Sequence, residues 1–295
     1  MKIGVVLPSE LASTADPDWV SAFATRAEAL GYDEISVVEH SVVIADTSST
    51  YPYAPDGRSP LPDDCPLPDP LELLAFVAAR TERLGLATGV LVLPNHHPVV
   101  LAKRLATLDR LSGGRLRICL GVGWMREEIE ACGGDFEHRG ALADEAIAAM
   151  RALWRDTSAA GASFDGTRYR FARAHSWPKP VRPDGVPLFI GGHSTAAARR
   201  AGRIGDGFQP LGLAGDDLAA AVATMRDAAR EAGRDPSEVE LVLGATLGRV
   251  DAERVEQAAA QGASRLLLSV SRGASTPEDV LGQLDSAAQR LGLAR

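Results

Sequence analysis

Short apolar runs alternate with helical segments along almost the whole chain, and this alternation restricts the fold more than any other feature. A strand that is buried on both faces of a parallel sheet shows such a continuous apolar run. A helix between two runs returns the chain, so that the next strand can lie parallel to the last. Eight strand–helix units therefore predict an α/β fold, a (β/α)8 TIM barrel, with a doubly wound open sheet as the alternative. The predicted strands are 3–7, 35–38, 86–93, 115–120, 188–190, one that begins at 207, 240–245 and 265–269.

Helix start and stop signals occupy the segments between these runs. Asp16 is placed as an N-cap, Pro17 stands at the first helical position, and Gly31 follows the last turn. The predicted helices are about 17–30, 70–84, 98–111, one from about 126, 140–154, one from Ser194 or Thr195 to Gly205, 216–233, 252–262 and 277–291.

The length of 295 residues suits one such barrel, which commonly takes about 250 residues, so we expect residues 1–295 to form a single domain with insertions. Segment 41–70 is rich in Pro, Asp and Ser, and loops of this length in compact domains are usually lids or binding loops. Segment 157–187 is predicted as a second insertion, with a hairpin at 164–171 and a proline-rich return at 177–187.

Net charge and cysteine content indicate which partners are disfavoured and in which compartment the protein is expected. A net charge of −8 and a pI near 5.3 argue against nucleic acid and anionic membranes as partners. No apolar stretch reaches the roughly 18 residues of a membrane span, and the first residues lack a signal-peptide pattern. Cys65, Cys119 and Cys132 are widely spaced, which favours a reducing cytoplasm over a disulfide framework or a zinc site.

Barrel enzymes carry their active sites at the C-terminal ends of the strands. In this chain those ends are rich in glycine and poor in carboxylates. A binuclear metal hydrolase of this fold needs a His-x-His pair on its first strand and a carboxylate on its last strand, and this sequence has neither. His96 and His97 are interpreted as loop residues, because no third metal ligand is placed nearby. The pattern predicts a flat, phosphate-bearing cofactor and no metal. The strand ends are 8–9, 39–40, 94–97, 121–124, 191–194 and 209–210.

The turn 191–194 connects the fifth strand to an Ala-rich helix. Gly191 and Gly192 carry no Cβ, so that a phosphate can approach the backbone closely. The helix N-terminus offers free N–H groups and the positive end of the helix dipole. With His193 and Ser194, these residues form a predicted phosphate site. A tight turn that needs a positive φ is the alternative interpretation.

Four further positions are candidates for contact with a cofactor or substrate. His40 follows the second strand and either faces the reactive centre or is a histidine hydrogen-bonded at the strand end. Glu39 either orients His40 or lies across the barrel wall. Gly89 interrupts an apolar strand, which is typical of a bulge or of close approach to a ligand. Trp124 either stacks on a bound ring or caps the barrel.

Four stretches carry more specific motifs: LGLATGVLVLP at 84–94, LAKRLATLDRLSGGR at 101–115, GVGWMREE at 121–128, and IGGHS at 190–194 with GDG at 205–207. With these motifs the chain resembles the luciferase-like monooxygenase superfamily, most closely the coenzyme F420-dependent oxidoreductases of actinobacteria. The resemblance covers nearly the whole chain, including the proline-rich part of segment 41–70.

The resemblance implies a TIM barrel of the bacterial luciferase-like type, with a (deaza)isoalloxazine ring in its mouth and a non-prolyl cis peptide behind the ring, here at Gly89–Val90. It matches Glu39-His40 to the acidic–His pair beside the reactive carbon in F420-dependent dehydrogenases, with Glu in place of the more common Asp. Those dehydrogenases place a catalytic Glu soon after Gly-Val-Gly. The aligned residue here is Arg126, or Glu127 if the loop shifts, and this departure leaves the substrate open.

We therefore predict an oxidoreductase that transfers a hydride between F420 and a small organic substrate, with His40 and Glu39 as catalytic residues. The alternatives are an FMN-dependent monooxygenase that uses reduced flavin and O2, a non-catalytic flavin- or deazaflavin-binding protein, and a metal-dependent barrel hydrolase. Members of this family often form homodimers, and the acidic, Ala-rich helix faces fit either state. The predicted cofactor-binding residues are Gly89, Val90, Asn95, Gly121, Gly123, Trp124, Gly191, Gly192, His193 and Ser194.

Overall fold

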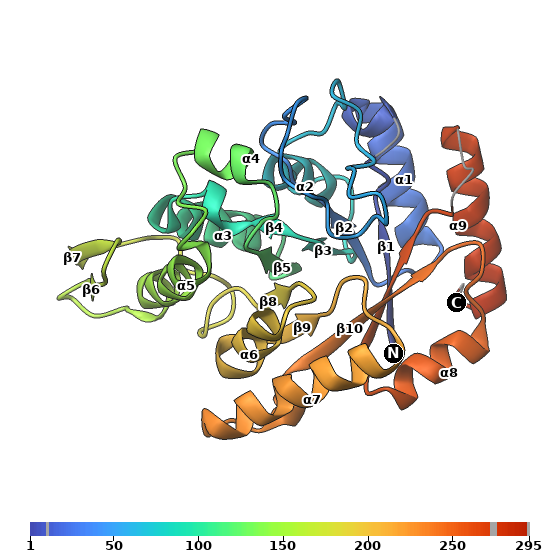
Figure 1. The fold of residues 1–295 in the computed structure, drawn as a ribbon. Helices are drawn as coiled ribbons and strands as arrows, with labels where there is room; N and C mark the ends of the chain where they lie inside the picture. The colour runs from blue at the N-terminus through green and yellow to red at the C-terminus, as the bar shows by residue number, and fades with distance from the viewer. Residues whose placement is uncertain (10–11, 272–275, 294–295) are drawn as a thin grey trace.

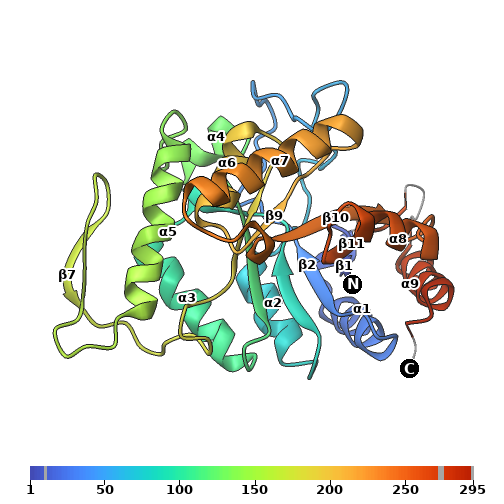
Figure 2. The same ribbon diagram turned by 90° about the horizontal axis from the view of Figure 1, so that it is seen from below.

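The computed structural model describes residues 1–9, 12–271 and 276–293. Its centre is a closed barrel of parallel strands with helices around it (Figures 1 and 2). Neighbouring strands follow the order β3-β2-β1-β11-β10-β9-β8-β5-β4, and the additional pairing of β3 with β5 closes the ring, which excludes an open sheet. β3 and β4 are parts of one barrel strand, so the barrel has eight. The barrel strands are β1 Lys2–Val6, β2 Glu34–Val37, β3 Gly85–Thr88, β4 Leu91–Val92, β5 Leu116–Gly121, β8 Leu188–Gly191, β9 Gly207–Gln209, β10 Glu240–Thr246 and β11 Arg265–Ser269.

Two helices begin next to the residues that the sequence marks as N-caps. The side chain of Asp16 accepts hydrogen bonds from the N–H groups of Asp18 and Trp19, with Pro17 at the first helical position. Ser194 caps the helix after β8, because its Oγ accepts from the N–H of Ala197. The helices are α1 Pro17–Ala29, α2 Pro70–Ala78, α3 Pro98–Leu111, α4 Arg126–Ala131, α5 Arg139–Arg155, α6 Thr195–Ile204, α7 Gly215–Glu231, α8 Ala252–Ala260 and α9 Pro277–Leu291, with short 3-10 turns at Ala12–Ala15, Leu93–Asn95 and Pro236–Glu238.

Two elements differ from the prediction. The run 86–93 predicts one continuous strand, but the chain forms β3 and β4, separated by Gly89 and by a cis peptide bond between Gly89 and Val90. The helix expected over 70–84 ends at Ala78. The backbone N–H groups of residues 82–84 instead donate to the carboxylate of Glu28 in α1, at 3.0, 2.6 and 2.8 Å from Oε1, so the helical ladder stops before them.

The core has two layers, as barrels of this kind require. The larger apolar cluster lies between the strands and the surrounding helices. Inside the barrel, Cys119, Phe189, Val242 and Leu267 form a second cluster. At the N-terminal end of the barrel, a cluster of charged side chains takes the place of apolar core residues. There Arg117 pairs with Glu34 at 2.7 Å and Arg265 bridges Glu34 and Glu240, with the Arg117 guanidinium 4.6 Å from the centre of the Phe189 ring.

Two insertions leave the barrel. Segment 41–70 contains no helix or strand before Pro70, and its residues Tyr51, Pro60 and Leu61 lie against the ends of β1, β2 and β11. We call this segment the lid. The second insertion forms the hairpin of β6 Ala162–Asp165 and β7 Arg170–Ala174, which projects beside α5 (Figures 1 and 2). Among the helices of the described residues, none is long and apolar enough to cross a membrane.

Candidate functional site

The mouth of the barrel holds a cavity of about 240 Å³. Its walls come from the C-terminal ends of β1, β2 and β11 and from the lid, so it lies where barrel enzymes bind their ligands. Leu7, Val38, Val270 and Leu61 give apolar walls, and His40 is the one imidazole among the residues that line it. The cavity therefore places His40 beside any molecule that enters the mouth.

His40 is held by a glutamate from another part of the chain. Its Nδ1 lies 2.8 Å from Oε2 of Glu128 in α4, and the side chains are 12% and 2% exposed. A carboxylate only accepts hydrogen bonds, so Nδ1 carries the proton and donates it to Glu128. The Nε2 atom of the same ring is then the nitrogen that remains for a proton exchange in the mouth.

The Glu128 carboxylate is fixed from two further sides. Its Oε1 accepts from the backbone N–H of Ser41 at 2.6 Å and from Nδ2 of Asn95 at 3.2 Å. Three donors on one buried carboxylate leave it little freedom to turn, so the ring of His40 is held in one orientation. Asn95, predicted to contact the cofactor, here contacts Glu128 and Ser41.

Glu39 forms a separate pair with a different histidine. Its Oε1 accepts from Nε2 of His96 at 2.6 Å, and its Oε2 accepts from the backbone N–H of Val92 at 2.5 Å. Of the two readings of Glu39, the structure supports the one that turns it toward the barrel wall, away from His40. His96 was interpreted as a loop residue, and it connects the loop after the 3-10 turn Leu93–Asn95 to Glu39, while Val92 connects β4 to the same carboxylate.

Glu128 is the residue that the sequence reasoning missed. The resemblance pointed to Arg126 or Glu127 for a glutamate near the reactive centre, but the side chain beside His40 is the next one along α4. Arg126 pairs with Glu130 and Glu137 on the surface. Glu127 accepts hydrogen bonds from Thr47, Ser48 and Ser49 of the lid. Of the three side chains only that of Glu128 is buried, and no signal in the sequence distinguished it from its neighbours.

The cis peptide and two of the predicted glycines meet around one side chain. Val90 packs inside the barrel, where a Cβ at Gly121 would lie 2.6 Å from its Cγ2 and a Cβ at Gly191 would overlap its Cγ1. These glycines therefore make room for Val90. Gly123, with φ of 75°, forms the turn before α4, and a Cβ there would meet Val92 and Ile129.

The floor beside Gly89 carries two buried polar side chains, Ser36 and Gln209. Oγ of Ser36 and Oε1 of Gln209 are buried and have no hydrogen-bond partner in the described part of the chain. A Cβ at Gly89 would approach both side chains, at 2.8 Å from Oγ of Ser36 and 3.3 Å from Nε2 of Gln209. Buried polar groups without partners are uncommon, so a ligand with polar edges fits this position. Gln209 is one of the strand ends named from the sequence, whereas Ser36 was not singled out.

The turn after β8 has the geometry of an anion site. Gly192 has φ of 135°, a region that favours glycine, and its N–H donates to the Gln209 carbonyl at 3.2 Å. The next N–H groups, from 193 to 196, have no acceptor among the residues the structure describes. They lie at the N-terminus of α6, where the helix dipole favours an anion. The turn therefore has the positive φ of one interpretation and the unused N–H groups that the other requires, and the phosphate site itself stays a prediction.

Aromatic rings line the side of the mouth between His40 and this turn. Trp124 meets His40 edge to face at 6.1 Å between ring centres and Tyr51 at 5.2 Å. Tyr53 lies 5.4 Å from Tyr51 and 5.3 Å from the ring of His193. Tyr51 and Tyr53 belong to the lid, so the lid adds the outer half of this aromatic wall. A flat conjugated ring fits between such walls.

These features together fit a flat cofactor with a phosphate. No group of three or more His, Cys, Asp or Glu side chains that could hold a metal ion occurs within residues 1–9, 12–271 and 276–293. The free N–H groups of the turn suit a phosphate, and the unpaired atoms of Ser36 and Gln209 suit the polar edge of a ring.

Comparison with known proteins agrees with this chemistry. The family model described as luciferase-like monooxygenase matches residues 1–292. An uncharacterised protein of Mycobacterium tuberculosis is 33% identical over 74% of this chain and 74% of its own. The F420-dependent glucose-6-phosphate dehydrogenase of Nakamurella multipartita is 30% identical over 77% of this chain and 62% of its own. A solved F420-dependent secondary alcohol dehydrogenase, in complex with an F420–acetone adduct, has a TM-score of 0.76 at 20% identity, covering 100% of this chain and 99% of that one.

Proposed function

The chain belongs to the luciferase-like monooxygenase family, whose members are F420- or FMN-dependent oxidoreductases and monooxygenases, and from this premise we propose that it transfers a hydride between coenzyme F420 and a small organic substrate. The observation that carries the proposal is the pair of His40 and Glu128 at the cavity in the mouth. A histidine whose Nδ1 is fixed on a buried carboxylate presents Nε2 as an acid or base of defined position.

Two groups of residues would hold the cofactor. The N–H groups that follow Gly192 would bind its phosphate, and Ser36 and Gln209 would bind the polar edge of its ring beside Val90. Bound F420 supplies a hydride acceptor or donor at its C5 carbon. Trp124 and the two lid tyrosines would cover the ring and keep water out of the mouth.

His40 would move the proton that accompanies the hydride. If a substrate alcohol is oxidised, Nε2 accepts the hydroxyl proton, and in the reverse direction it returns the proton to the carbonyl oxygen. Glu128 holds the ring and stabilises the positive charge that forms when Nε2 is protonated. Glu39, predicted to be catalytic, would act at a distance by holding the end of β2 through His96 and Val92.

An FMN-dependent monooxygenase is the second candidate function, and the description of the matching family favours it. Both cofactors present a phosphate to the turn after β8, so this turn fits either one. A non-catalytic flavin- or deazaflavin-binding protein needs the same phosphate site but has no use for a histidine locked on a carboxylate in the mouth. As part of the proposal, the enzyme acts in a reducing cytoplasm, which agrees with the wide spacing of its three cysteines.

The test is a paired titration of the apo-protein with F420 and with FMN, followed by tryptophan fluorescence. Trp124 contacts His40 and Tyr51, which line the cavity in the mouth, so a ring that binds there should change its emission. Tight binding of F420 with weak binding of FMN is expected, and the reverse result would move the assignment to the FMN-dependent monooxygenase. The variant His40→Ala is then expected to bind F420 with unchanged affinity and to lose about 10²- to 10⁴-fold in kcat. Unchanged turnover in this variant would refute the proton-transfer role.

A further inference from the structure

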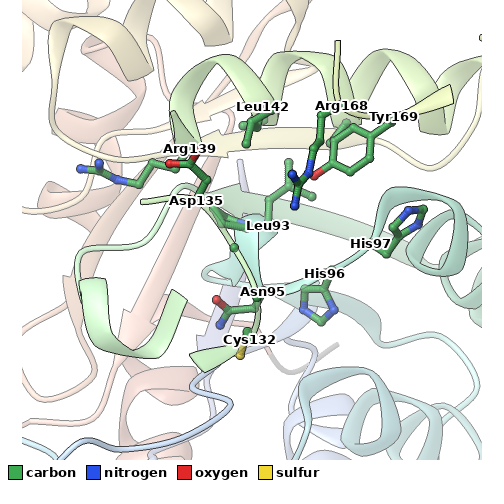
Figure 3. Close-up of a pocket in the computed structure, with 15 residues that line it drawn as sticks. Leu93, Asn95, His96, His97, Cys132, Asp135, Arg139, Leu142, Arg168 and Tyr169 are labelled. Atoms are coloured by element: carbon green, nitrogen blue, oxygen red, sulfur yellow. The ribbon is translucent and has the colours of Figure 1, made fainter. Parts of the chain in front are cut away.

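The cavity in the mouth has a lining without ionised side chains. The described residues that form it are aliphatic residues, prolines, serines, a tyrosine and His40, with no Asp, Glu, Lys or Arg among them. A second cavity, of about 160 Å³ and outside the mouth, includes Asp135, Arg139 and Arg168 in its lining (Figure 3). The uncharged lining is therefore a property of the mouth and not of every cavity in this fold.

The apolar walls of the mouth cavity come from two parts of the chain. Leu7, Val38 and Val270 directly follow β1, β2 and β11 and form the wall on the barrel side. Pro60 and Leu61 form the wall on the lid side. A molecule between these walls buries apolar surface on two sides, which favours an apolar ligand.

His40 is the polar side chain that a buried partner fixes in this cavity. Its Nδ1 is bonded to Glu128, so Nε2 remains for an oxygen of the ligand. Two of the serines already have partners, since Oγ of Ser59 accepts from a backbone N–H of the lid at 3.3 Å and Oγ of Ser269 donates to a backbone carbonyl of β10 at 3.5 Å. A hydroxyl group buried against the apolar walls finds no such partner, and its burial is costly. The cavity therefore suits a ligand with one oxygen.

The carboxylate behind His40 disfavours ionised ligands of either sign. Glu128 is 2% exposed, and its negative charge repels an anion in these apolar surroundings. Its oxygens already accept from His40, Ser41 and Asn95, so they are engaged before a cationic ligand arrives. An ion that enters the mouth would lose its hydration without gaining an opposite charge in exchange.

The volume of the cavity limits the size of the ligand. An engineered apolar cavity of about 150 Å³ holds benzene, so the 240 Å³ of this cavity would hold on the order of ten non-hydrogen atoms. An alcohol or ketone with a single ring is of this size. A phosphorylated sugar is larger, and it also carries several hydroxyl groups and a charge.

We propose that the substrate is a small uncharged alcohol or the corresponding carbonyl compound, with one oxygen and an apolar remainder, and that polyols, carboxylates and sugar phosphates bind poorly. This inference rests on the proposed function, in which the alcohol gives its hydride to the cofactor and its hydroxyl proton to Nε2 of His40 and leaves as the carbonyl compound. The oxygen would lie at His40, and the apolar remainder would lie between Leu7 and Leu61.

The experiment compares ligands that share a cyclohexane ring and differ in polarity or charge. Cyclohexanol, cyclohexanecarboxylate, cyclohexylamine and inositol are titrated into the full chain at neutral pH, with saturation-transfer NMR as the readout. The titrations are made without cofactor and with reduced F420, which cannot take a hydride from an alcohol. Saturable binding of cyclohexanol is expected. The other ligands should displace it at least tenfold more weakly, because a single buried polar group without a partner costs about that factor.

Displacement of cyclohexanol is the quantity to compare, because a carboxylate can also bind at the turn after β8 without entering the mouth. Leu61→Arg brings a positive charge to the cavity from the lid, where it disturbs no helix or strand. In this variant cyclohexanol should bind about tenfold more weakly, and cyclohexanecarboxylate about tenfold more tightly. Val42→Arg is the control, because it adds the same charge at an exposed lid residue outside the lining and should change neither affinity.

The inference is overturned if cyclohexanol binds in neither state, if any of the other ligands displaces it with equal affinity, or if Leu61→Arg and Val42→Arg behave alike. Reduction of F420 by cyclohexanol, followed by absorbance, tests the proposed function separately. Binding in the expected order without this reduction would count against the proposed function alone. Reduction of F420 by inositol but not by cyclohexanol would overturn the substrate class and leave the proposed function standing.

Discussion

Nδ1 of His40 lies 2.8 Å from Oε2 of Glu128, and this contact joins the end of β2 to α4 across 88 positions of sequence. Next to it, Glu39 pairs with His96. Two consecutive residues thus each form a histidine–carboxylate pair, and the two pairs face different ways. The His40–Glu128 pair lines the mouth, and the Glu39–His96 pair stabilises the barrel wall. The dipeptide Glu39-His40 therefore contributes both to the proposed chemistry and to the structure.

Removing the charge of Glu128 should reduce turnover without changing cofactor affinity. In Glu128→Gln the side-chain carbonyl can still accept from Nδ1 of His40, so we expect a loss of about tenfold in kcat. In Glu128→Leu three donors lose their acceptor, and the loss should reach about 10²-fold or more with lowered stability. Glu130→Gln, on the exposed side of α4, is the control. Steady-state kinetics with a separate titration of cofactor binding would check this order, and equal kcat in all variants would contradict it.

The local parts of the fold could be predicted from the sequence, because their signals are local. The cap at Asp16 and the buried run at 265–269 define their elements through neighbouring residues alone. The pairing of His40 could not be predicted in the same way. Adjacent residues in extended chain point to opposite sides, so Glu39 was a poor candidate for its partner. The true partner depends on how the loop after β5 places α4, which no local pattern encodes.

The glycines of the mouth show a similar limit to what the sequence can predict. The sequence marks Gly121 and Gly191 as places where something approaches the backbone closely, and the structure agrees that a Cβ has no room. The group that approaches is Val90, the residue before β4, which lies next to both only because β4 pairs with β5 and β5 pairs with β8. A glycine reveals that space is needed, whereas the identity of the neighbour comes from the tertiary structure.

A double-mutant cycle should therefore detect coupling between Val90 and Gly191. Gly191→Ala places a methyl group against Cγ1 of Val90, and overpacking of this kind destabilises by about 1–3 kcal/mol. Val90→Ala opens space, so the double variant should be more stable than the sum of the single effects predicts, by about 1 kcal/mol. Urea unfolding of the four proteins measures the coupling. Strictly additive values would show that the two side chains do not compete for the same space.

Gly192→Ala should affect the cofactor site more than the fold. Its φ of 135° is a conformation that other residues adopt at a cost of about 1–3 kcal/mol, and a Cβ would lie 3.1 Å from that of Ala197. The turn would relax and displace the N–H groups at the start of α6, so cofactor affinity should fall by at least tenfold. Gly282→Ala in α9 is the matched control, because a Cβ there meets no atom within 4 Å. An unchanged cofactor affinity in Gly192→Ala would argue against a phosphate at this turn.

Glu127 should hold the lid closed over a wide range of pH. Hydrogen bonds from its own backbone N–H and from Ser48 and Ser49 hold the pKa of this carboxyl well below its usual range. Because the pKa in the folded state is lowered, the stabilising contribution is present above the unfolded pKa of about 4.3 and is lost only as the pH falls through the lower folded value. The lid of the parent protein should therefore remain protected from hydrogen exchange at pH values as low as about 4, after correction for intrinsic exchange rates.

Glu127→Gln removes this attachment and provides the sharper test. The amide would keep part of the hydrogen bonding to Thr47 and the two serines but lose the charge, so the lid should open more often. Arg58 lies exposed within the lid and provides a trypsin site, at which cleavage at neutral pH should become about tenfold faster. Glu130→Gln removes one negative charge from the same helix without touching the lid and should be cleaved like the parent. Equal cleavage rates in all three proteins would mean that the aromatic contacts of Tyr51 and Tyr53 hold the lid without Glu127.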